Sequence, residues 1–247
     1  MQRIKCVISY DGTQFSGYQI QPNARTVQES VQDGLTKIHK GNKVVVHSSG
    51  RTDASVHAVG QVIHFDSPLA IPEERWPLAL QAVTPDDIVI HSATYVSKDF
   101  HARYSAERKE YRYRILRRSE RDVFRRHYTY HYPYPLDVEA MKKATDLLKG
   151  THDFTSFCTP RTEVIDKVRT IYEVELYETE DELVMRFVGN GFLYNMVRIL
   201  VGTLLEVGNK QRHPDDIKNI LEAKRRESAG KTAPGQGLYL WRVEYNN

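Results

Sequence analysis

The segment with the clearest chemical potential is a short polar loop, Ser49–Ala58, which reads Ser-Gly-Arg-Thr-Asp-Ala-Ser-Val-His-Ala. It contains a carboxylate, Asp53, two residues after the guanidinium of Arg51. An ionised carboxylate can act as a nucleophile, and an arginine beside it can bind phosphate. On spacing alone, an aspartate in a glycine-bounded loop is more often a turn former or a partner in a surface ion pair. The loop is therefore a candidate site whose chemistry depends on other parts of the chain.

Positive charge is concentrated in one stretch, from Arg103 to His127. This stretch holds ten basic and four acidic residues, a net charge of +6, whereas the whole chain carries only +3. Nearly all of the excess is arginine, and tyrosines are interleaved with it. Arginines and aromatic rings together suit phosphate contacts and base stacking, which favours RNA binding. A solvated strand face followed by a solvated loop is the alternative reading of the same residues.

Hydrophobic periodicity predicts the elements that position these residues. Apolar residues at helical spacing follow Thr26-Val27-Gln28-Glu29, which has the form of a capping box. Tyr111 and Tyr113 alternate with arginines, which is typical of a strand with an aromatic and a cationic face. We expect helices at 27–40, 72–82, 136–148, 192–206 (with Gly208 as C-cap) and 215–223, strands at 3–10, 44–47, 60–65, 88–95, 109–116, 168–177, 183–188 and 238–245, and loops at 48–59 and 151–161. This order predicts an α+β fold with antiparallel strands and helices packed on one side.

Composition sets limits on location and partners. The chain is 40% apolar and 27% charged, as in soluble globular proteins. No apolar run approaches the roughly 20 residues that span a bilayer, and no signal peptide is recognised after Met1. Cys6 and Cys158 make neither a disulfide framework nor a cysteine-rich zinc site. We therefore expect a cytoplasmic protein with no membrane partner.

The candidate loop and five further segments resemble the tRNA pseudouridine synthase A family. The loop is similar to the family's Gly-Arg-Thr-Asp-(small)-Gly-Val-His-Ala element. The other similar segments, in the family's order, are Tyr10–Gln19, Arg25–Gln28, Phe100–Ala106 with Tyr111–Tyr113, Asp153–Phe157 with Phe192–Arg198, and Thr232–Leu240. Together they extend over the length of the chain, so the resemblance does not depend on one motif.

The resemblance implies an isomerase that converts uridine to pseudouridine at positions 38 to 40 of the tRNA anticodon stem-loop. Such a reaction needs no cofactor, because nothing is oxidised and no group is donated. The resemblance further implies two similar α/β halves, at 1–106 and 107–247, that share a central, largely antiparallel sheet with an active-site cleft between them. It also implies a homodimer in which one tRNA contacts both subunits.

Residue roles follow from the same resemblance. Asp53 would be the nucleophile, and Arg198 would keep it ionised, although Arg198 taken alone reads as a helix arginine that extends to the surface. Tyr111 would stack on the flipped uracil, although without the resemblance it reads as a half-buried strand tyrosine. Arg51 would help to extrude the target nucleotide or contact phosphate, and Arg103 would contact the substrate.

Two further residues of the candidate loop, Ser55 and His57, follow Asp53 closely in sequence. Ser55 stands where the family usually has glycine; if this position has positive φ, serine adds strain of about 1 kcal/mol. His57, with His47 and His64, lacks a recognised zinc spacing, so we expect a structural or RNA-contacting histidine and no metal site.

Two other functions would account for the same basic residues and the same carboxylate. A non-catalytic tRNA-binding or folding helper would share its basic charge, and a nucleoside hydrolase would use the same carboxylate to release uracil.

Overall fold

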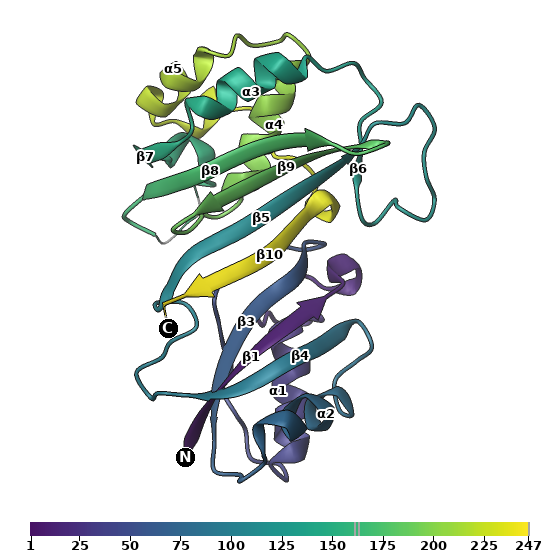
Figure 1. Ribbon diagram of the computed structural model, residues 1–247, viewed down its shortest axis with the longest axis vertical. Coiled ribbons are helices and arrows are strands. Elements are labelled where there is room, and N and C mark those ends of the chain that lie inside the picture. The colour runs from purple at the N-terminus through teal and green to yellow at the C-terminus, as the bar shows by residue number, and fades with distance from the viewer. Residues whose placement is uncertain (161, 163, 247) are drawn as a thin grey trace. The chain divides into compact units, whose positions relative to one another are not determined.

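The computed structural model describes residues 1–160, 162 and 164–246 of the chain. The chain divides into two compact units (Figure 1). The first unit comprises Met1–Glu107 and the segment from Tyr239 onward, and the second comprises Arg108–Leu238. The C-terminal segment, which the sequence analysis assigned to the second half, thus groups with the first unit.

The first unit is built on a sheet with the strand order β4-β1-β3-β10. The central strand β1 (Gln2–Tyr10) pairs antiparallel with both β3 (His57–Ser67) and β4 (Ile88–Val96). β10 (Leu238–Tyr245) is parallel to β3, with Tyr239 opposite His57. The two-residue strand β2 (His47–Ser48) pairs antiparallel with the other end of β3. The polar candidate loop therefore connects two strands that are hydrogen-bonded to each other.

Alternation in β1 decides which face of this sheet is buried. Its even-numbered residues from Ile4 to Tyr10 are buried, whereas the odd-numbered ones remain partly exposed. Two helices, α1 (Val27–Ile38) and α2 (Trp76–Gln81), lie next to each other, and α2 packs against β4 (Figure 1). Short 3-10 turns precede them at Gly12–Gln14 and Glu73–Arg75.

The second unit is built on an antiparallel sheet with the order β5-β9-β8-β7. Its strands are β5 (Ala106–Leu116), β7 (Gly150–Asp153), β8 (Val168–Glu178) and β9 (Glu182–Gly189), and β6 (Tyr130–His131) pairs parallel with the end of β5. The helices are α3 (Val138–Asp146), α4 (Met196–Gly208) and α5 (Asp216–Ala223), with 3-10 turns at Thr155–Phe157, Arg226–Ser228 and Gly235–Gly237. α3 contacts both α4 and β8.

Helix α4 is surrounded by other segments, and nearly all of its residues are apolar and buried. A Cβ on Gly202 would lie 1.7 Å from the carbonyl oxygen of Lys231, so only glycine allows this close passage. A Cβ on Gly208 would lie 2.6 Å from the sulfur of Met141 on α3. These two glycines let α4 sit deep in the core of the second unit.

The α+β class and the largely antiparallel pairing are confirmed, as are most predicted elements. Several boundaries were wrong. The strand predicted at 44–47 is reduced to β2, which begins only at His47, and the helices predicted at 72–82 and 136–148 are shorter, at Trp76–Gln81 and Val138–Asp146. The helix predicted from 192 begins only at Met196, because Asn195 has a left-handed backbone with φ of 61°, and its C-cap is Asn209, not Gly208. The strand predicted from Gly60 begins at His57, so the loop is shorter than expected. The predicted loop 151–161 contains β7 and a 3-10 turn, and Arg161 lies outside the described residues.

Candidate active site

The base of the candidate loop is fixed to strand β3 by a buried glutamine. The backbone N–H of Ser49 donates to Val62 O at 2.8 Å, and the Ser49 hydroxyl donates to Gln61 Oε1 at 2.6 Å. Gln61 Nε2 in turn donates to Gly50 O at 2.8 Å. Ser49 and Gln61 are fully buried, so these bonds are shielded from competing water. The chain therefore leaves β2 in a defined direction.

The middle of the loop is held by the segment that follows β1. The Tyr10 hydroxyl and Thr52 Oγ1 are 2.7 Å apart, and the Tyr18 N–H donates to Thr52 O at 3.0 Å. Burial raises the pKa of the Tyr10 hydroxyl to about 12, so this group stays protonated and able to donate. Gly17 has φ of 103°, and a Cβ there would lie 2.9 Å from Thr52 O. The residue before Asp53 is thus anchored through both its side chain and its backbone.

Asp53 itself stands at the edge of this anchored framework. It is half-buried, and Arg51 is exposed. The carbonyl oxygen of Asp53 accepts from Val56 N–H at 3.2 Å, which closes a turn through Ala54 and Ser55. This arrangement fixes the backbone of Asp53 while leaving part of its side chain accessible to a substrate.

Ser55 adopts the strained conformation that the sequence analysis considered for this position. Its φ is 62°, in the left-handed region that favours glycine. Its N–H donates to Phe15 O at 3.4 Å. The serine is therefore accommodated in the turn, at a conformational cost of about 1 kcal/mol relative to glycine.

His57 has a structural position at the start of β3. It is 2% exposed, and its ring stacks on that of Tyr239 with centroids 4.7 Å apart. Its Nδ1 lies 3.0 Å from the backbone nitrogen of Gly12. The neighbouring Asp11 carboxylate is 3.2 Å from the same ring nitrogen. The histidine thus joins the turn after β1 to the end of the candidate loop.

In the second unit, β5 presents the predicted tyrosines on its buried face. Tyr111 is 8% exposed and meets the ring of Phe192 edge-on, with centroids 5.2 Å apart. Tyr113 is fully buried and donates to Pro234 O at 2.8 Å. The predicted alternation of this strand is confirmed, because Arg112 and Arg114 remain partly exposed.

Arg198, on the first turn of α4, is held on two sides. Its Nε donates to Ala233 O at 2.7 Å, and its NH1 group donates to Asn195 Oδ1 at 2.8 Å. The Asn195 amide also donates to Thr159 Oγ1 at 2.8 Å. These bonds hold the guanidinium near the start of the helix, so Arg198 does not extend freely into solvent as an isolated helix arginine would. Asp53 belongs to the first unit and Arg198 to the second, and their pairing stays a prediction.

Arg103 lies in an exposed segment of the first unit that histidines and aromatic rings organise. The N–H of Ala102 donates to His64 Nδ1 at 3.1 Å, and the Tyr245 hydroxyl donates to Ala102 O at 2.7 Å. The Arg103 guanidinium carbon lies 5.8 Å from the ring centre of Tyr104. Arg103 is therefore presented at the surface by a fixed backbone.

Three histidines form a cluster that was not predicted from the sequence. His64 lies 4.9 Å from His47 and 4.7 Å from His101, measured between ring centroids. Burial, followed by the charges of its neighbours, lowers the pKa of His64 to about 4. Local sequence gives no sign of this cluster, because His101 approaches from 37 residues away in sequence.

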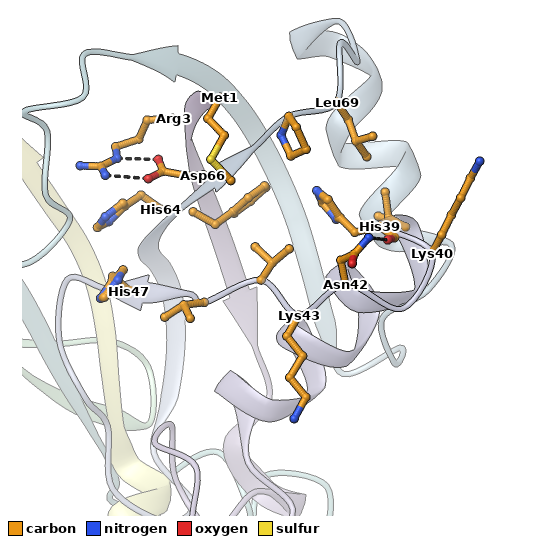
Figure 2. Close-up of a pocket in the computed structure, with 15 residues that line it drawn as sticks. Met1, Arg3, His39, Lys40, Asn42, Lys43, His47, His64, Asp66 and Leu69 are labelled. Carbon is orange, nitrogen blue, oxygen red and sulfur yellow. Dashed lines mark hydrogen bonds and ion pairs between the residues drawn. The ribbon is translucent and has the colours of Figure 1, made fainter.

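A pocket of about 640 Å³ opens beside this cluster (Figure 2). It is lined by residues that include His39, Lys40, Lys43, His47 and His64, and by none of the five predicted site residues. In the described part of the chain, no group of three or more histidine, cysteine, aspartate or glutamate side chains is arranged so that it could hold a metal ion, the histidine cluster included. The pocket is therefore separate from the residues to which we assign the chemistry.

Comparisons with known proteins show the family to which the chain belongs. A family model described as tRNA pseudouridine synthase matches residues 6–105 and 144–246. The tRNA pseudouridine synthase A of Anoxybacillus flavithermus is 61% identical over 247 residues, which is 100% of both chains. That of Bacillus subtilis is 58% identical over 246 residues, 99% of this chain and 100% of the other. The chain belongs to the tRNA pseudouridine synthase family, and it is an isomerase.

A chain in the crystal structure of a Cbf5-Nop10-Gar1 complex is similar at a TM-score of 0.35 and 13% identity, over 81% of this chain and 54% of that one. Among the described residues, no helix has both the length and the apolar character needed to cross a membrane.

Proposed function

We propose that this protein isomerises uridine to pseudouridine at positions 38 to 40 of the tRNA anticodon stem-loop, with Asp53 as the nucleophile. The observation that carries the role of Asp53 is the anchoring of its loop. Buried bonds from Gln61, Tyr10 and Tyr18 hold the residues before it, and yet Asp53 remains half-buried. A nucleophile must be positioned to within a fraction of an ångström and must also be reachable by its substrate.

The reaction conserves every atom of the substrate. The N1–C1′ bond of uridine breaks, the uracil turns in place, and C5 forms the new bond to C1′. The proton on C5 leaves, and N1 takes up a proton. The Asp53 carboxylate attacks the nucleoside to begin this sequence and is released unchanged at the end, so no oxidant, reductant or group donor is required.

Arg198 and Tyr111 support this chemistry in the proposal. A carboxylate in an apolar site resists ionisation because burial favours its neutral form. Arg198, whose guanidinium is already oriented by Ala233 and Asn195, supplies the opposing positive charge. The ring of Tyr111 stacks on the flipped uracil, and its hydroxyl assists removal of the C5 proton.

Arg51 and Arg103 act on the nucleic acid. A base inside a paired stem must leave the helix before it can react, which costs a few kcal/mol. Arg51 is exposed beside Asp53 and helps to extrude the nucleotide or to hold its phosphate. Arg103 contacts the substrate from the exposed segment of the first unit. By family resemblance the protein works in the cytoplasm as a homodimer that binds one tRNA across both subunits.

The test separates an isomerase from the two alternative functions. Unmodified tRNA transcripts are incubated with the wild-type protein and with Asp53→Ala, pseudouridine is mapped by position, and free uracil is measured. The proposal expects pseudouridine at positions 38 to 40 with wild type only, and no free uracil. Asp99→Ala, in an exposed loop, is the matched control and should behave as wild type. Product from Asp53→Ala would contradict the role of Asp53, and free uracil from wild type would indicate a hydrolase.

A further inference from the structure

The arginine-rich stretch seen in the sequence separates into two groups in the structure. Several of its arginines are neutralised by acidic residues, most of them from strands β8 and β9 or the turn between them. The pairs are Arg112 with Glu110 at 2.6 Å, Arg114 with Glu182 at 2.8 Å, Arg117 with Glu178 at 3.5 Å and Arg108 with Glu173 at 3.6 Å. These guanidinium groups already have carboxylate partners, so the cationic face of β5 offers nucleic acid less charge than its sequence suggests.

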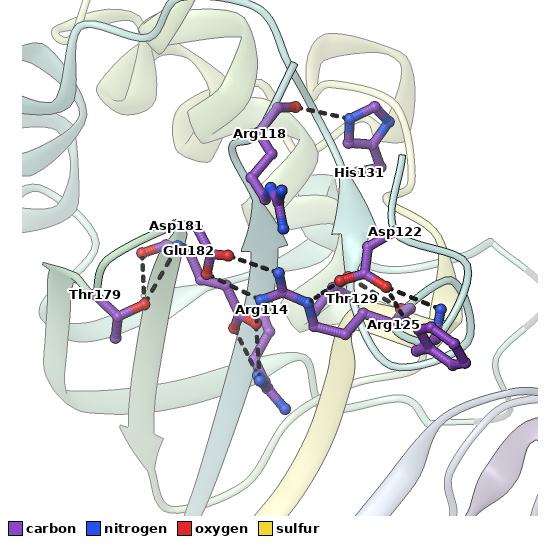
Figure 3. Close-up of polar contacts among 10 residues, drawn as sticks. Arg114, Arg118, Asp122, Arg125, Thr129, His131, Thr179, Asp181 and Glu182 are labelled. Atoms are coloured by element: carbon purple, nitrogen blue, oxygen red, sulfur yellow. Dashed lines mark hydrogen bonds and ion pairs between the residues drawn. The ribbon is translucent and has the colours of Figure 1, made fainter. Parts of the chain in front are cut away.

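Arg125 is also paired, and it determines the shape of the loop 117–129 that follows β5 (Figure 3). Its Nε lies 2.7 Å from Asp122 Oδ2, and its two NH groups lie 2.9 and 2.6 Å from the carboxylate oxygens of Asp181. It also contacts Glu182 at 3.2 Å. The hydrogen bond from Arg125 is the main reason that the pKa values of Asp122 and Asp181 are lowered. One arginine thus joins the loop to the turn between β8 and β9.

The backbone of the loop is fixed around the same residue. The Asp122 carboxylate accepts from the N–H groups of Phe124 at 2.9 Å and Arg125 at 3.2 Å. Arg125 O accepts from Tyr128 N–H at 2.9 Å and from Thr129 N–H at 3.0 Å. These bonds form a short, defined turn, so the residues at its tip are held outward.

The loop also carries a second group of arginines, Arg118 at its base and Arg121 and Arg126 nearer its tip, together with apolar side chains. Arg118, Arg121 and Arg126 are exposed, and none of them forms a salt bridge with a carboxylate of the described residues. Between them, Val123 is 61% exposed and Phe124 is 85% exposed. A large aromatic ring held in water among three cations is a feature that the proposed chemistry at Asp53 does not use.

We infer that the exposed side chains of the loop 117–129 form an RNA-docking surface, with Arg118, Arg121 and Arg126 on backbone phosphates and Phe124 stacked on an unpaired base. Arginine forms paired hydrogen bonds to phosphate, and aromatic stacking accepts any base. A second protein chain is a poorer fit, because closing an interface over three guanidinium groups that have no carboxylate partner leaves cations desolvated. The inference rests on the proposed function for the identity of the RNA as tRNA, and not on the role of Asp53.

The electrostatic part is tested by the salt dependence of binding. The Kd for an unmodified tRNA transcript is measured at several salt concentrations for wild type and for the triple variant Arg118→Gln, Arg121→Gln, Arg126→Gln. Each lost phosphate contact should lower the slope of log Kd against log salt by about 0.7–0.9, so the triple variant should lose about two to three. The control replaces three exposed lysines elsewhere, Lys98, Lys210 and Lys218, by glutamine, and should change the slope less. Equal slopes for wild type and the triple variant would overturn the inference.

The stacking part is tested at Phe124. Phe124→Ala should weaken tRNA binding by about 5- to 160-fold, since stacking contributes about 1–3 kcal/mol per base, and Phe124→Trp should restore it. Sedimentation of both variants without RNA shows whether this surface instead binds a second protein chain. If Phe124→Ala changed subunit association and left the tRNA affinity of the assembled protein unchanged, the surface would be a protein interface and the inference would be wrong.

Arg125 offers a variant that tests the shape of the loop and not its charge alone. Arg125→Lys keeps a positive charge but cannot reach Asp122 and Asp181 together in the same geometry. It should weaken tRNA binding and speed hydrogen exchange at the amides of Phe124 and Thr129. Binding and exchange both at wild-type values would contradict the assigned role of Arg125. Because all three tests measure binding, they can be repeated in Asp53→Asn, so a failure here is distinct from a failure of the proposed catalysis.

Discussion

At the scale of single residues, the candidate loop is held in place mainly by residues outside its recognisable motif. Asp53 and Arg51 were predicted from sequence, because the motif around them is distinctive. The bonds that hold them come from Tyr10, Tyr18 and Gln61, which lie on either side of the loop in sequence and have no spacing that marks them. Their contribution depends on which strands pair, and local periodicity does not determine that.

The positive φ of Ser55 leads to the first prediction. Ser55→Gly should relieve about 1 kcal/mol of strain, raise the thermal midpoint by about 2–4 °C and leave the rate of pseudouridine formation unchanged or higher. Thermal unfolding and single-turnover kinetics provide the check. A large loss of activity would show that the turn tolerates serine without strain and uses its side chain.

The bond between Tyr10 and Thr52 leads to the second prediction. Thr52→Val keeps the shape of the side chain but leaves the buried Tyr10 hydroxyl with one partner fewer, at a cost of about 1–3 kcal/mol. If the bond positions Asp53, kcat should fall on the order of tenfold while the Kd for tRNA is unchanged, and Thr52→Ser should restore kcat. Equal changes in affinity and kcat, or no rescue by serine, would indicate a purely structural bond.

At the scale of elements, the predicted order of the longer helices and strands is confirmed, the short strands β6 and β7 were not predicted, and the other errors lie at the ends of elements. The helix α4 was predicted to start at 192 because its apolar residues begin there, but the left-handed Asn195 delays the first turn to Met196. That delay places Arg198 on the first turn of the helix, within reach of Asn195. Likewise, β3 begins three residues earlier than Gly60 because His57 pairs with Tyr239, from the other end of the chain.

The histidine cluster next to β3 leads to the third prediction. Burial keeps His64 neutral, as do its neighbours His47, His101 and Arg3, while Asp66 acts in the opposite direction. Its folded-state pKa of about 4 lies below the ordinary histidine value of 6.5, so the unfolded chain binds the extra proton first. The free energy of unfolding should therefore fall as pH decreases from about 6.5 towards 4.

Denaturant unfolding at a series of pH values measures this effect. His64→Gln, which keeps a hydrogen-bond acceptor for Ala102 but does not titrate, should show a flatter dependence over the same range. If the variant and wild type lost stability in parallel, the cluster would not be the cause.

At the scale of the whole molecule, the proposed reaction requires residues from both units. Asp53 and Arg51 belong to the first unit, and Tyr111 and Arg198 to the second. Sequence resemblance named these residues together, although nothing in their spacing joins them. By contrast, the role of Arg125 was invisible in the sequence, because Asp122 and Asp181 meet only after β8 and β9 have paired.

The proposed partnership of Asp53 and Arg198 leads to the fourth prediction. Removing the cation in Arg198→Gln should raise the pKa of Asp53, so ionised carboxylate is present only at higher pH. The acid limb of the profile of kcat against pH should therefore move to higher pH, and Arg198→Lys should move it less. An acid limb at the same pH in all three proteins would separate Arg198 from the ionisation of Asp53.

The central claim is that Asp53 performs the chemistry and does not merely support RNA binding. Its most direct test is a paired measurement on Asp53→Asn, which replaces the carboxylate by a group of nearly the same shape that is a poor nucleophile. The Kd for tRNA and the single-turnover rate of pseudouridine formation are measured on the same preparation. The account predicts a Kd within a few-fold of wild type and no detectable pseudouridine. A single-turnover rate within about tenfold of wild type would contradict it, because about 1.4 kcal/mol is far less than the loss of a nucleophile should cost.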